Sequence, residues 1–164
     1  MLIGILSDTH GTLSPTAYAE MADCDHIIHA GDICGPDILA DLSELAPVTA
    51  VLGNNDYAEY GSDVGRFATP VIGGVQFLIT HKPEDLRAAL MGRTSVLQPG
   101  QPVPAVAIHG HTHVPEMLTG KDAWPAPLML CPGSVTRPRR SKRTVIKLEV
   151  EDGRIRDIRF VELA

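Results

Sequence analysis

The sequence has little of what a secreted, disulfide-bonded domain needs. Its 164 residues include only three cysteines, an odd number, and no Cys-x-x-Cys pair. This pattern argues against a disulfide framework, so we expect reduced thiols and a cytoplasmic location. The first residues contain neither the basic segment nor the small-residue cleavage site of a signal peptide, which agrees with that expectation.

The chain also lacks a long apolar run and an excess of positive charge. No hydrophobic stretch approaches the length that spans a bilayer, so we expect no membrane association. The formal net charge of −6 argues against a stable complex with nucleic acid or an anionic membrane, because such binding depends on cationic side chains. Bound metal ions would reverse the sign locally, so a small phosphorylated substrate is still compatible with this charge.

The composition is that of an ordinary folded domain. Hydrophobic residues make up 44% of the chain and charged residues 21%. A chain of 164 residues is long enough to bury its own core, and neither an internal repeat nor a linker divides it. We therefore expect residues 1–164 to form a single domain.

The first third of the chain alternates short apolar runs with helical patterns. Strands are predicted at residues 2–6, 26–30 and 48–52, with helices between them from 15 to about 22 and from 36 to 46. Ser14 and Pro15 supply an N-cap followed by proline at the first helical position. This alternation predicts a parallel sheet, and ligands bind beyond the carboxyl ends of the strands in such sheets.

The second part of the chain has a different pattern. Apolar segments at 66–72 and 75–79 flank Gly73-Gly74, which indicates a hairpin. A helix is predicted at 83–91, a loop at 94–104 and a strand at 105–108. A second hairpin is predicted from 143–150 and 154–162, joined at Asp152-Gly153. These hairpins predict a second or mixed sheet, and hence an α/β domain.

Five polar segments with metal-binding chemistry follow the predicted strands. They are Asp8-Thr9-His10, Gly31-Asp32, Gly53-Asn54-Asn55-Asp56, Thr80-His81 and Gly110-His111-Thr112-His113. Asp8 and His10 are two residues apart, so they point the same way on an extended segment and can reach one ion. Mixed imidazole and oxygen ligands suit Mn, Fe, Co, Ni or Zn better than Ca or Mg.

The charges of these side chains match a phosphodiester. Two divalent ions, less the charges of Asp8, Asp32 and one hydroxide, leave roughly one positive charge. A phosphodiester carries one negative charge. The neutral amide at Asn54 preserves this balance, and the carboxylate of Asp32 has two oxygens with which to bridge two ions.

The ordered set of motifs resembles the calcineurin-like metallophosphoesterase superfamily. The length and the opening segment Ile3–His10 are similar to its small prokaryotic phosphodiesterase (YfcE-like) branch. The resemblance implies a four-layer αββα sandwich with two mixed β-sheets flanked by helices. It also implies two divalent transition-metal ions per chain. Manganese is the expected metal, with nickel, iron, cobalt and zinc as alternatives.

The same resemblance assigns the ligands and the reaction. One metal would take Asp8, His10, Asp32 and His113, and the other would take Asp32, Asn54, His81 and His111. The implied activity is that of a phosphoric diester hydrolase, in which a metal-bound hydroxide attacks phosphorus in line. His111 and Asn55 are the residues expected to act on the substrate in catalysis.

Two positions depart from the family pattern. Many members have a histidine where this chain has Asn55, and an amide cannot protonate a leaving group at neutral pH. We therefore expect slow turnover of diesters with poor leaving groups, and a rate independent of leaving-group pKa would contradict this. The turn Cys131-Pro132-Gly133-Ser134 has a thiol where the family often has asparagine, which affects the surroundings of the metals.

Other residues near the motifs suggest roles in substrate binding and support. Arg137 and Arg139, in a basic cluster after the Gly133-Ser134 turn, are candidates for contacting the substrate phosphate. His29 and His109 lie beside the ligand segments and could orient them. Asp56 is expected to hydrogen-bond its own loop rather than bind metal.

The expected partner is a small phosphodiester, with nucleotides among the candidates, and exposed apolar patches could serve a homo-oligomer. Two alternatives remain open. One is a phosphomonoesterase or nucleotide phosphatase. The other is a non-catalytic scaffold of the same fold, like the retromer subunit of this superfamily, which has lost key ligands. All seven ligand positions are kept here, which favours catalysis.

Overall fold

The computed structural model describes residues 1–164, which form three α-helices and two β-sheets. The elements are β1 (Leu2–Leu6), α1 (Pro15–Met21), β2 (His26–His29), α2 (Pro36–Ser43), β3 (Val48–Ala50), β4 (Phe67–Ala68), β5 (Val71–Ile72), β6 (Val75–Thr80), α3 (Pro83–Leu90), β7 (Val106–Ile108), β8 (Pro115–Thr119), β9 (Leu128–Pro132), β10 (Thr144–Glu151) and β11 (Arg154–Glu162). All three helices begin with proline at the first turn, and the Ser14 side chain caps α1 as predicted.

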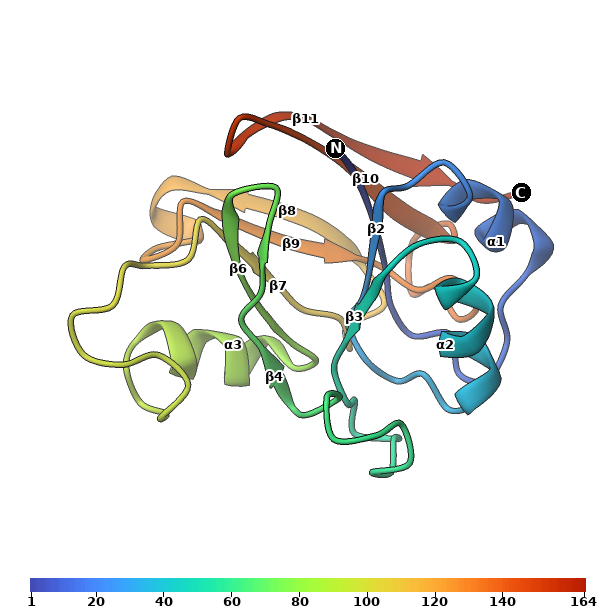
Figure 1. The fold of residues 1–164 in the computed structure, drawn as a ribbon, viewed down its shortest axis with the longest axis horizontal. Coiled ribbons are helices and arrows are strands. Elements are labelled where there is room, and N and C mark those ends of the chain that lie inside the picture. Colours follow the sequence, from blue (N-terminus) through green and yellow to red (C-terminus); the bar gives the residue numbers. More distant parts are fainter.

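Both sheets are mixed (Figure 1). The five-stranded sheet has the order β11-β10-β1-β2-β3, and the other has the order β4-β6-β7-β9-β8 with β5 paired to β6. The strands β1, β2 and β3 run parallel to one another, and so do β6, β7 and β9. Each sheet therefore has a parallel core whose carboxyl ends lie at one edge.

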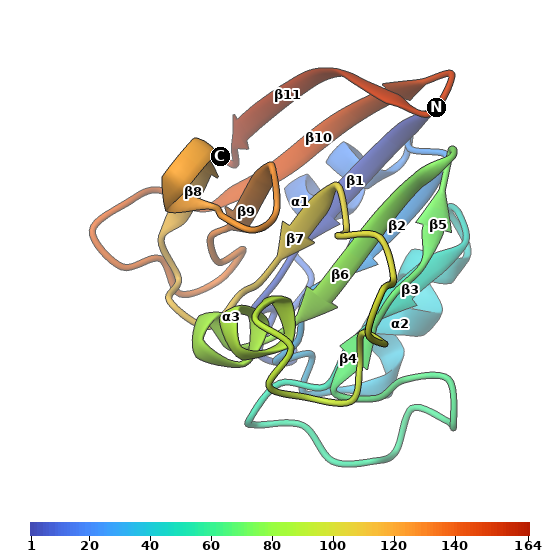
Figure 2. The ribbon, with the colours of Figure 1, turned by 90° about the vertical axis from the view of Figure 1, so that its left-hand side faces the viewer.

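The alternation of side chains along the strands produces the predicted four layers. Ile5 of β1 and Ile79 of β6 belong to one buried cluster between the two sheets. The neighbouring residues point the other way, so Leu6 packs in the cluster beneath α1 and α2, and Leu78 packs in the cluster beneath α3. Figure 2 shows this order, with α3 in front of the β6 sheet and with α1 and α2 behind the β1 sheet.

The structure corrects the predictions for the second part of the chain in two places. Residues 66–72 form two short strands, β4 and β5, because Pro70 lies between them and has no N–H for a sheet hydrogen bond. The strands β8 and β9 were not predicted; they pair antiparallel with each other, and β9 is a buried central strand between β7 and β8. None of the helices is both long and apolar enough to cross a membrane.

Candidate metal centre

The residues predicted as metal ligands lie in the loops that follow the parallel strands of both sheets. Asp8 and His10 follow β1, Asp32 follows β2, and Asn54 lies beyond β3. From the other sheet, His81 follows β6, and His111 and His113 follow β7. Because the two parallel cores end at the same edge, side chains more than a hundred residues apart in the sequence come into contact there.

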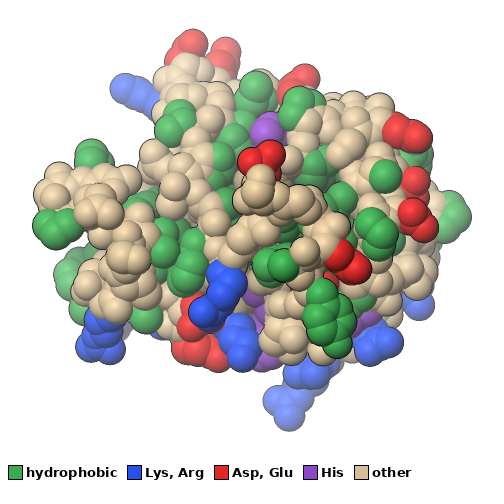
Figure 3. Space-filling model, turned by 60° about the horizontal axis from the view of Figure 1, so that its bottom comes forward, with side chains coloured by type: hydrophobic (Ala, Val, Ile, Leu, Met, Phe, Trp, Pro, Cys, Tyr) green, Lys and Arg blue, Asp and Glu red, His purple; other side chains and the backbone are tan.

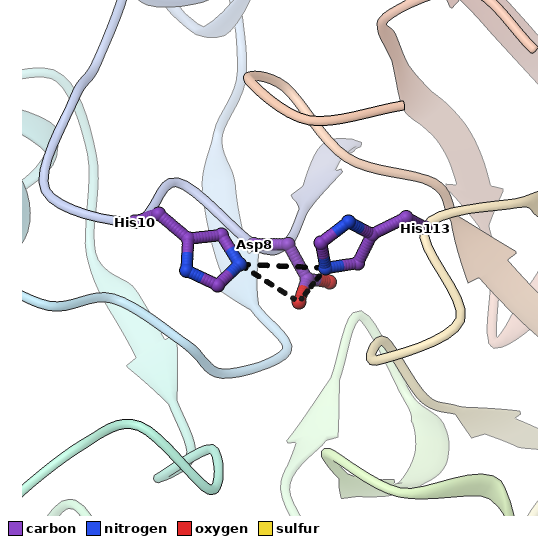
Figure 4. Close-up of side chains that lie close together, drawn as sticks. All are labelled: Asp8, His10 and His113. Carbon is purple, nitrogen blue, oxygen red and sulfur yellow. Dashed lines mark hydrogen bonds and ion pairs between the residues drawn. The ribbon is translucent and has the colours of Figure 1, made fainter. Parts of the chain in front are cut away.

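The first cluster joins Asp8, His10 and His113 (Figure 4). The Nε2 atom of His113 lies 3.1 Å from Oδ1 of Asp8, and Nε2 of His10 lies 3.7 Å from the same oxygen. The two Nε2 atoms are 3.3 Å apart. Three ligand atoms thus face a common point.

The second cluster joins Asp8, Asp32 and His81. The Nε2 atom of His81 lies 3.4 Å from Oδ2 of Asp32 and 3.7 Å from Oδ1 of Asp8. The same Oδ2 of Asp32 lies 3.7 Å from Nε2 of His10, which belongs to the first cluster. Asp32 therefore faces imidazoles of both clusters, which is the position a bridging carboxylate needs.

Asn54, Asn55 and His111 complete the outer side of the site. Oδ1 of Asn54 contacts Nδ1 of His111 at 3.0 Å, and the His111 ring stands edge-on to the ring of His81. Asn55 donates hydrogen bonds to Asp32 from its backbone N–H at 2.9 Å and from its side-chain amide at 2.8 Å. Asn55 thus contacts the metal-ligand candidate Asp32 and orients its carboxylate.

The chemistry of these donors fits a divalent transition-metal ion. Nδ1 of His81 donates to the carbonyl oxygen of Ala30 at 2.7 Å, and Nδ1 of His113 donates to that of Arg137 at 2.6 Å. In the neutral rings, both Nε2 atoms then present lone pairs to the cluster. Oδ1 of Asp8 and Nε2 of His81 are buried without a hydrogen-bond partner, and a cation would satisfy both atoms.

The charges of the site shift the pKa values of its members. Burial alone would raise the pKa of Asp32, but the nearby ring of His81 and hydrogen bonds from Asn55 lower it well below its usual range. Burial opposes the charged form of His81, but Asp32 and Asp8 raise its pKa overall. Burial lowers the pKa of His10 in spite of the same two carboxylates. A metal ion that binds here must compete with a proton on His81.

Many of the ligand candidates have a left-handed backbone conformation. Positive φ angles of 46° to 71° occur at Asp8, His10, Asp32, His111 and His113. Each costs about 1–3 kcal/mol for a residue other than glycine, so the surrounding structure must hold these loops in place. Some of the hydrogen bonds that do so join the ligand loops directly, such as that from the N–H of His10 to the carbonyl oxygen of Asp32 at 3.0 Å, and others come from residues outside the ligand set.

Asp56 holds two of the ligand loops together. Its carboxylate accepts a hydrogen bond from the N–H of Gly53 at 2.8 Å, which confirms the predicted contact within its own loop. It also accepts from the N–H groups of Ile33 and Cys34, at 3.1 Å and 2.8 Å, in the loop that carries Asp32. Bonds to a charged acceptor are the stronger kind, so this carboxylate is a major support of the site.

Two glycines allow these loops to approach one another. A Cβ atom on Gly53 would collide with the backbone nitrogen and Oδ1 of Asp32. One on Gly110 would collide with the Ser7 hydroxyl and lie 2.9 Å from Oδ2 of Asp8. The glycines of the Gly-Asn-Asn-Asp and Gly-His-Thr-His motifs are therefore required by close packing against the carboxylates.

The sequence did not indicate several of the supporting residues. The hydroxyls of Ser134 and Thr136 each donate to the carbonyl oxygen of Asp8 at 2.9 Å. The hydroxyl of Thr9 donates to the carbonyl oxygen of Ile33 at 3.0 Å. The only sequence signal for these supports was the Pro-Gly-Ser turn. The acceptors are backbone carbonyl oxygens, which every residue has, so the sequence does not identify them.

His29 links the first two ligand loops, as the sequence suggested. Its Nδ1 atom accepts from the N–H of Gly31 at 3.2 Å, and Nε2 lies 3.0 Å from the hydroxyl of Thr9. That hydroxyl already donates to a carbonyl oxygen, so Nε2 carries the proton and donates to it. The other candidate, His109, donates from Nδ1 to the carbonyl oxygen of Gly110 at 2.8 Å, next to the His111 segment.

We expect His29 to make the protein less stable in acid. Complete burial lowers the pKa of His29 from 6.5 to about 3. Below pH 6.5 the unfolded chain binds a proton at His29 and the folded chain does not, so stability falls as the pH falls. Between pH 7 and pH 5 the free energy of unfolding should decrease by about 2 kcal/mol more in the wild type than in His29→Gln. Urea unfolding at several pH values measures this, and parallel curves for the two proteins would contradict it.

The metal cluster opens into a pocket of about 390 Å³ that contains the predicted substrate-binding residues. Its lining includes Arg137 and Arg139 as well as Asn54, Asn55 and His111. In Figure 3, histidine side chains lie among lysine and arginine side chains in the lower middle of this face. The predicted ligands and the predicted substrate contacts therefore share one opening.

The cysteines take no part in the two clusters. Cys131 is buried, and its Sγ atom lies 3.6 Å from the hydroxyl of Thr112. Cys34 lies closer, with Sγ 4.0 Å from Nδ1 of His10. Burial is the main cause that raises the pKa of each thiol to about 11, so both are uncharged at neutral pH.

Two mixed sheets that bring Asp and His side chains together at the ends of their parallel strands define a metal-dependent phosphoesterase fold and site. The chain belongs to the calcineurin-like phosphoesterase superfamily, whose domain model matches residues 1–153. This confirms the resemblance that the motifs indicated. The family is metal-dependent, and the clusters above are where a metal would bind in this chain.

Known proteins similar to this chain agree with this assignment. A probable metallophosphoesterase of Methanocaldococcus jannaschii is 34% identical over an alignment of 163 positions, which covers 93% of this chain and 77% of that protein. The structure of an archaeal phosphodiesterase is 26% identical with a TM-score of 0.75, covering 99% of this chain and all of that one. Vps29 of Entamoeba histolytica, solved with Zn²⁺, shares the fold at 18% identity and a TM-score of 0.68, with 99% of each chain covered.

Proposed function

We propose that this protein is a phosphodiesterase that depends on two divalent transition-metal ions. The observation that carries the proposal is the place of Asp32. One oxygen of this carboxylate lies 3.7 Å from His10 and 3.4 Å from His81, so it faces the imidazoles of two clusters. A single-metal site would not need this arrangement.

The chain has a full set of ligands for two ions. Asp8, His10, Asp32 and His113 would hold one ion, and Asp32, Asn54, His81 and His111 would hold the other. When bound, the ions supply an activated water and neutralise charge on the phosphate. We propose manganese as the metal, with nickel, iron, cobalt and zinc as alternatives that suit the same imidazole and oxygen donors. Free cysteines are consistent with the cytoplasm as the place of action.

The chain's own residues position the substrate and the ligands. Asn55 holds Asp32 through two hydrogen bonds, and the N–H of His111 holds Asp8 at 3.1 Å. Arg137 and Arg139 line the pocket and attract an anionic substrate by charge. The amide of Asn55 cannot protonate a leaving group. A strong dependence of the hydrolysis rate on leaving-group pKa therefore stays a prediction.

A diester rather than a monoester is proposed because of the charge balance of the ligand set. With Asn54 instead of an aspartate, the two ions and their ligands keep roughly one positive charge, which one diester neutralises. The similarity to an archaeal phosphodiesterase supports the same choice. A monoesterase remains the alternative, and so does a scaffold, because proteins as different in sequence as Vps29 share this fold.

The test compares a diester with its matching monoester. The purified protein should bind about two manganese ions per chain and hydrolyse bis(p-nitrophenyl) phosphate at least tenfold more efficiently than p-nitrophenyl phosphate. His111→Ala and Asn54→Ala should lose most of this activity. The control His26→Ala removes a histidine that contacts Thr49, away from the site, and should keep it. Full activity in the first two variants would refute the proposed site. A folded, metal-free and inactive wild type would instead favour the scaffold.

A further inference from the structure

We propose that the natural substrate carries a second phosphate group beside the scissile diester, and that Arg137 and Arg139 bind it. This inference rests on the phosphodiesterase function proposed above. It names the class of substrate, a phosphodiester that also bears a terminal phosphate monoester.

The pocket beside the metal cluster is built for a strongly anionic ligand. None of its nine lining residues is hydrophobic. Arg137 and Arg139 are its cationic side chains, and the one carboxylate among the lining residues is the metal-ligand candidate Asp32. Neither arginine takes part in an ion pair, so each guanidinium is free to bind a ligand.

The segment that carries these arginines is anchored to the site. The N–H of Arg137 donates to the Ser134 hydroxyl at 2.9 Å, and the N–H of Arg139 donates to the carbonyl oxygen of His113 at 3.2 Å. The carbonyl oxygen of Arg137 accepts from the ring of His113 at 2.6 Å. Pro138 lies between the arginines and restricts the backbone further. Both exposed guanidinium groups thus start from a backbone that is tied to a metal-ligand candidate.

The charges of the metal ions, their ligands and the substrate indicate what these arginines bind. The charge that two ions would bring is balanced by Asp8, Asp32, the activated water and the scissile diester. Arg137 and Arg139 then add two positive charges that a simple diester leaves unpaired. A phosphate monoester carries about −1.5 to −2 at neutral pH and accepts bidentate hydrogen bonds from arginine. One such group therefore neutralises both side chains.

A second pocket, on the other side of Asn54, has a different charge pattern. Its cations Arg66 and Lys82 lie with the carboxylates Asp56 and Asp85. Arg66 is already paired with Asp85 at 3.0 Å. The two cations of that pocket are matched in number by two carboxylates, so of these two pockets only that of Arg137 and Arg139 has more arginine and lysine than carboxylate side chains.

The test uses two substrates that differ only by the second phosphate. They are thymidine 5′-(p-nitrophenyl phosphate) and the same compound with a 3′-phosphate, both assayed with manganese. The wild type should cleave the 3′-phosphorylated diester with a kcat/KM at least tenfold higher, through a lower KM. In the Arg137→Gln/Arg139→Gln double variant this ratio should fall to about one. Arg140→Gln removes the same charge from the same segment but does not line the pocket, and should keep the ratio.

A binding measurement provides a second readout that does not depend on turnover. Metal-free wild type should bind thymidine 3′,5′-bisphosphate about tenfold more tightly than thymidine 5′-monophosphate, and the double variant should bind the two equally. Equal kcat/KM values in the wild type, or a preference that survives in the double variant, would overturn the inference and leave the diesterase function standing. Release of inorganic phosphate instead of p-nitrophenolate would overturn it as well. If neither diester is cleaved, the proposed function fails, and the binding ratio alone decides whether the arginines select a second phosphate.

Discussion

Replacing Asp32 by asparagine should lower kcat/KM for a diester by more than about 1000-fold and reduce the bound metal to at most one ion per chain. One oxygen of Asp32 faces both His10 and His81, so the loss of this carboxylate weakens both ion sites at once. Metal ions contribute several kcal/mol of transition-state stabilisation, and each 1.36 kcal/mol corresponds to a factor of ten in rate.

The fold should survive this change. Asparagine keeps the shape and one carbonyl oxygen, which can still accept from the N–H of Asn55. The measurement is metal content by elemental analysis together with steady-state kinetics and thermal unfolding. Asp41→Asn, an exposed position on α2, is the matched control and should leave all three unchanged. Two ions per chain and activity within tenfold of the wild type would rule out the bridging role.

Replacing Asp56 by alanine should destabilise the protein by about 3 kcal/mol or more, although Asp56 is not a ligand. The substitution leaves the N–H groups of Gly53, Ile33 and Cys34 without their acceptor, and hydrogen bonds to a charged group are worth about 1.5–3 kcal/mol each. For a domain of this size the melting temperature should fall by roughly 6–12 °C. The metal affinity should fall as well, because the loops that carry Asp32 and Asn54 lose their common anchor.

The control for this prediction is Asp63→Ala. Asp63 is an exposed carboxylate seven residues further along the chain, with no ion pair in the structure, so its loss should change the melting temperature by only a degree or two. Calorimetry of the metal-free proteins separates the effect on the fold from the effect of lost metal. Equal melting temperatures for the two variants would show that the bonds to Asp56 contribute nothing to stability.

Much of the fold could be predicted because its strands are buried and bounded by clear turns. The run Leu2–Leu6 ends at a polar segment, and Gly73-Gly74 marks a hairpin that the structure contains. Strand β9 was missed because its apolar residues stand between Pro127 and Pro132, and proline usually argues against a central strand. Its parallel pairing with β7 depends on a long-range contact that local sequence does not encode.

The candidate metal site was easier to predict than the structure that supports it. Asp8, His10 and His113 carry chemistry that is visible in the sequence, and the structure brings them together. The supports are bonds from common residues, such as Ser134 and Thr136, to a backbone carbonyl oxygen. Many serines and threonines make such bonds, so only the folded geometry distinguishes these two. The role of Asn55 as a partner of Asp32 became visible in the same way.

The left-handed backbone at Asp8, His10, Asp32, His111 and His113 has a consequence for metal selection. These conformations form during folding, so an incoming ion meets a receptor that is already shaped and loses little entropy on capture. Such a receptor imposes its own geometry on the ion, so the ligand arrangement that each element accepts counts as well as its intrinsic affinity. Among the elements that accept this arrangement, the supply of free ions where the chain folds decides which one is bound.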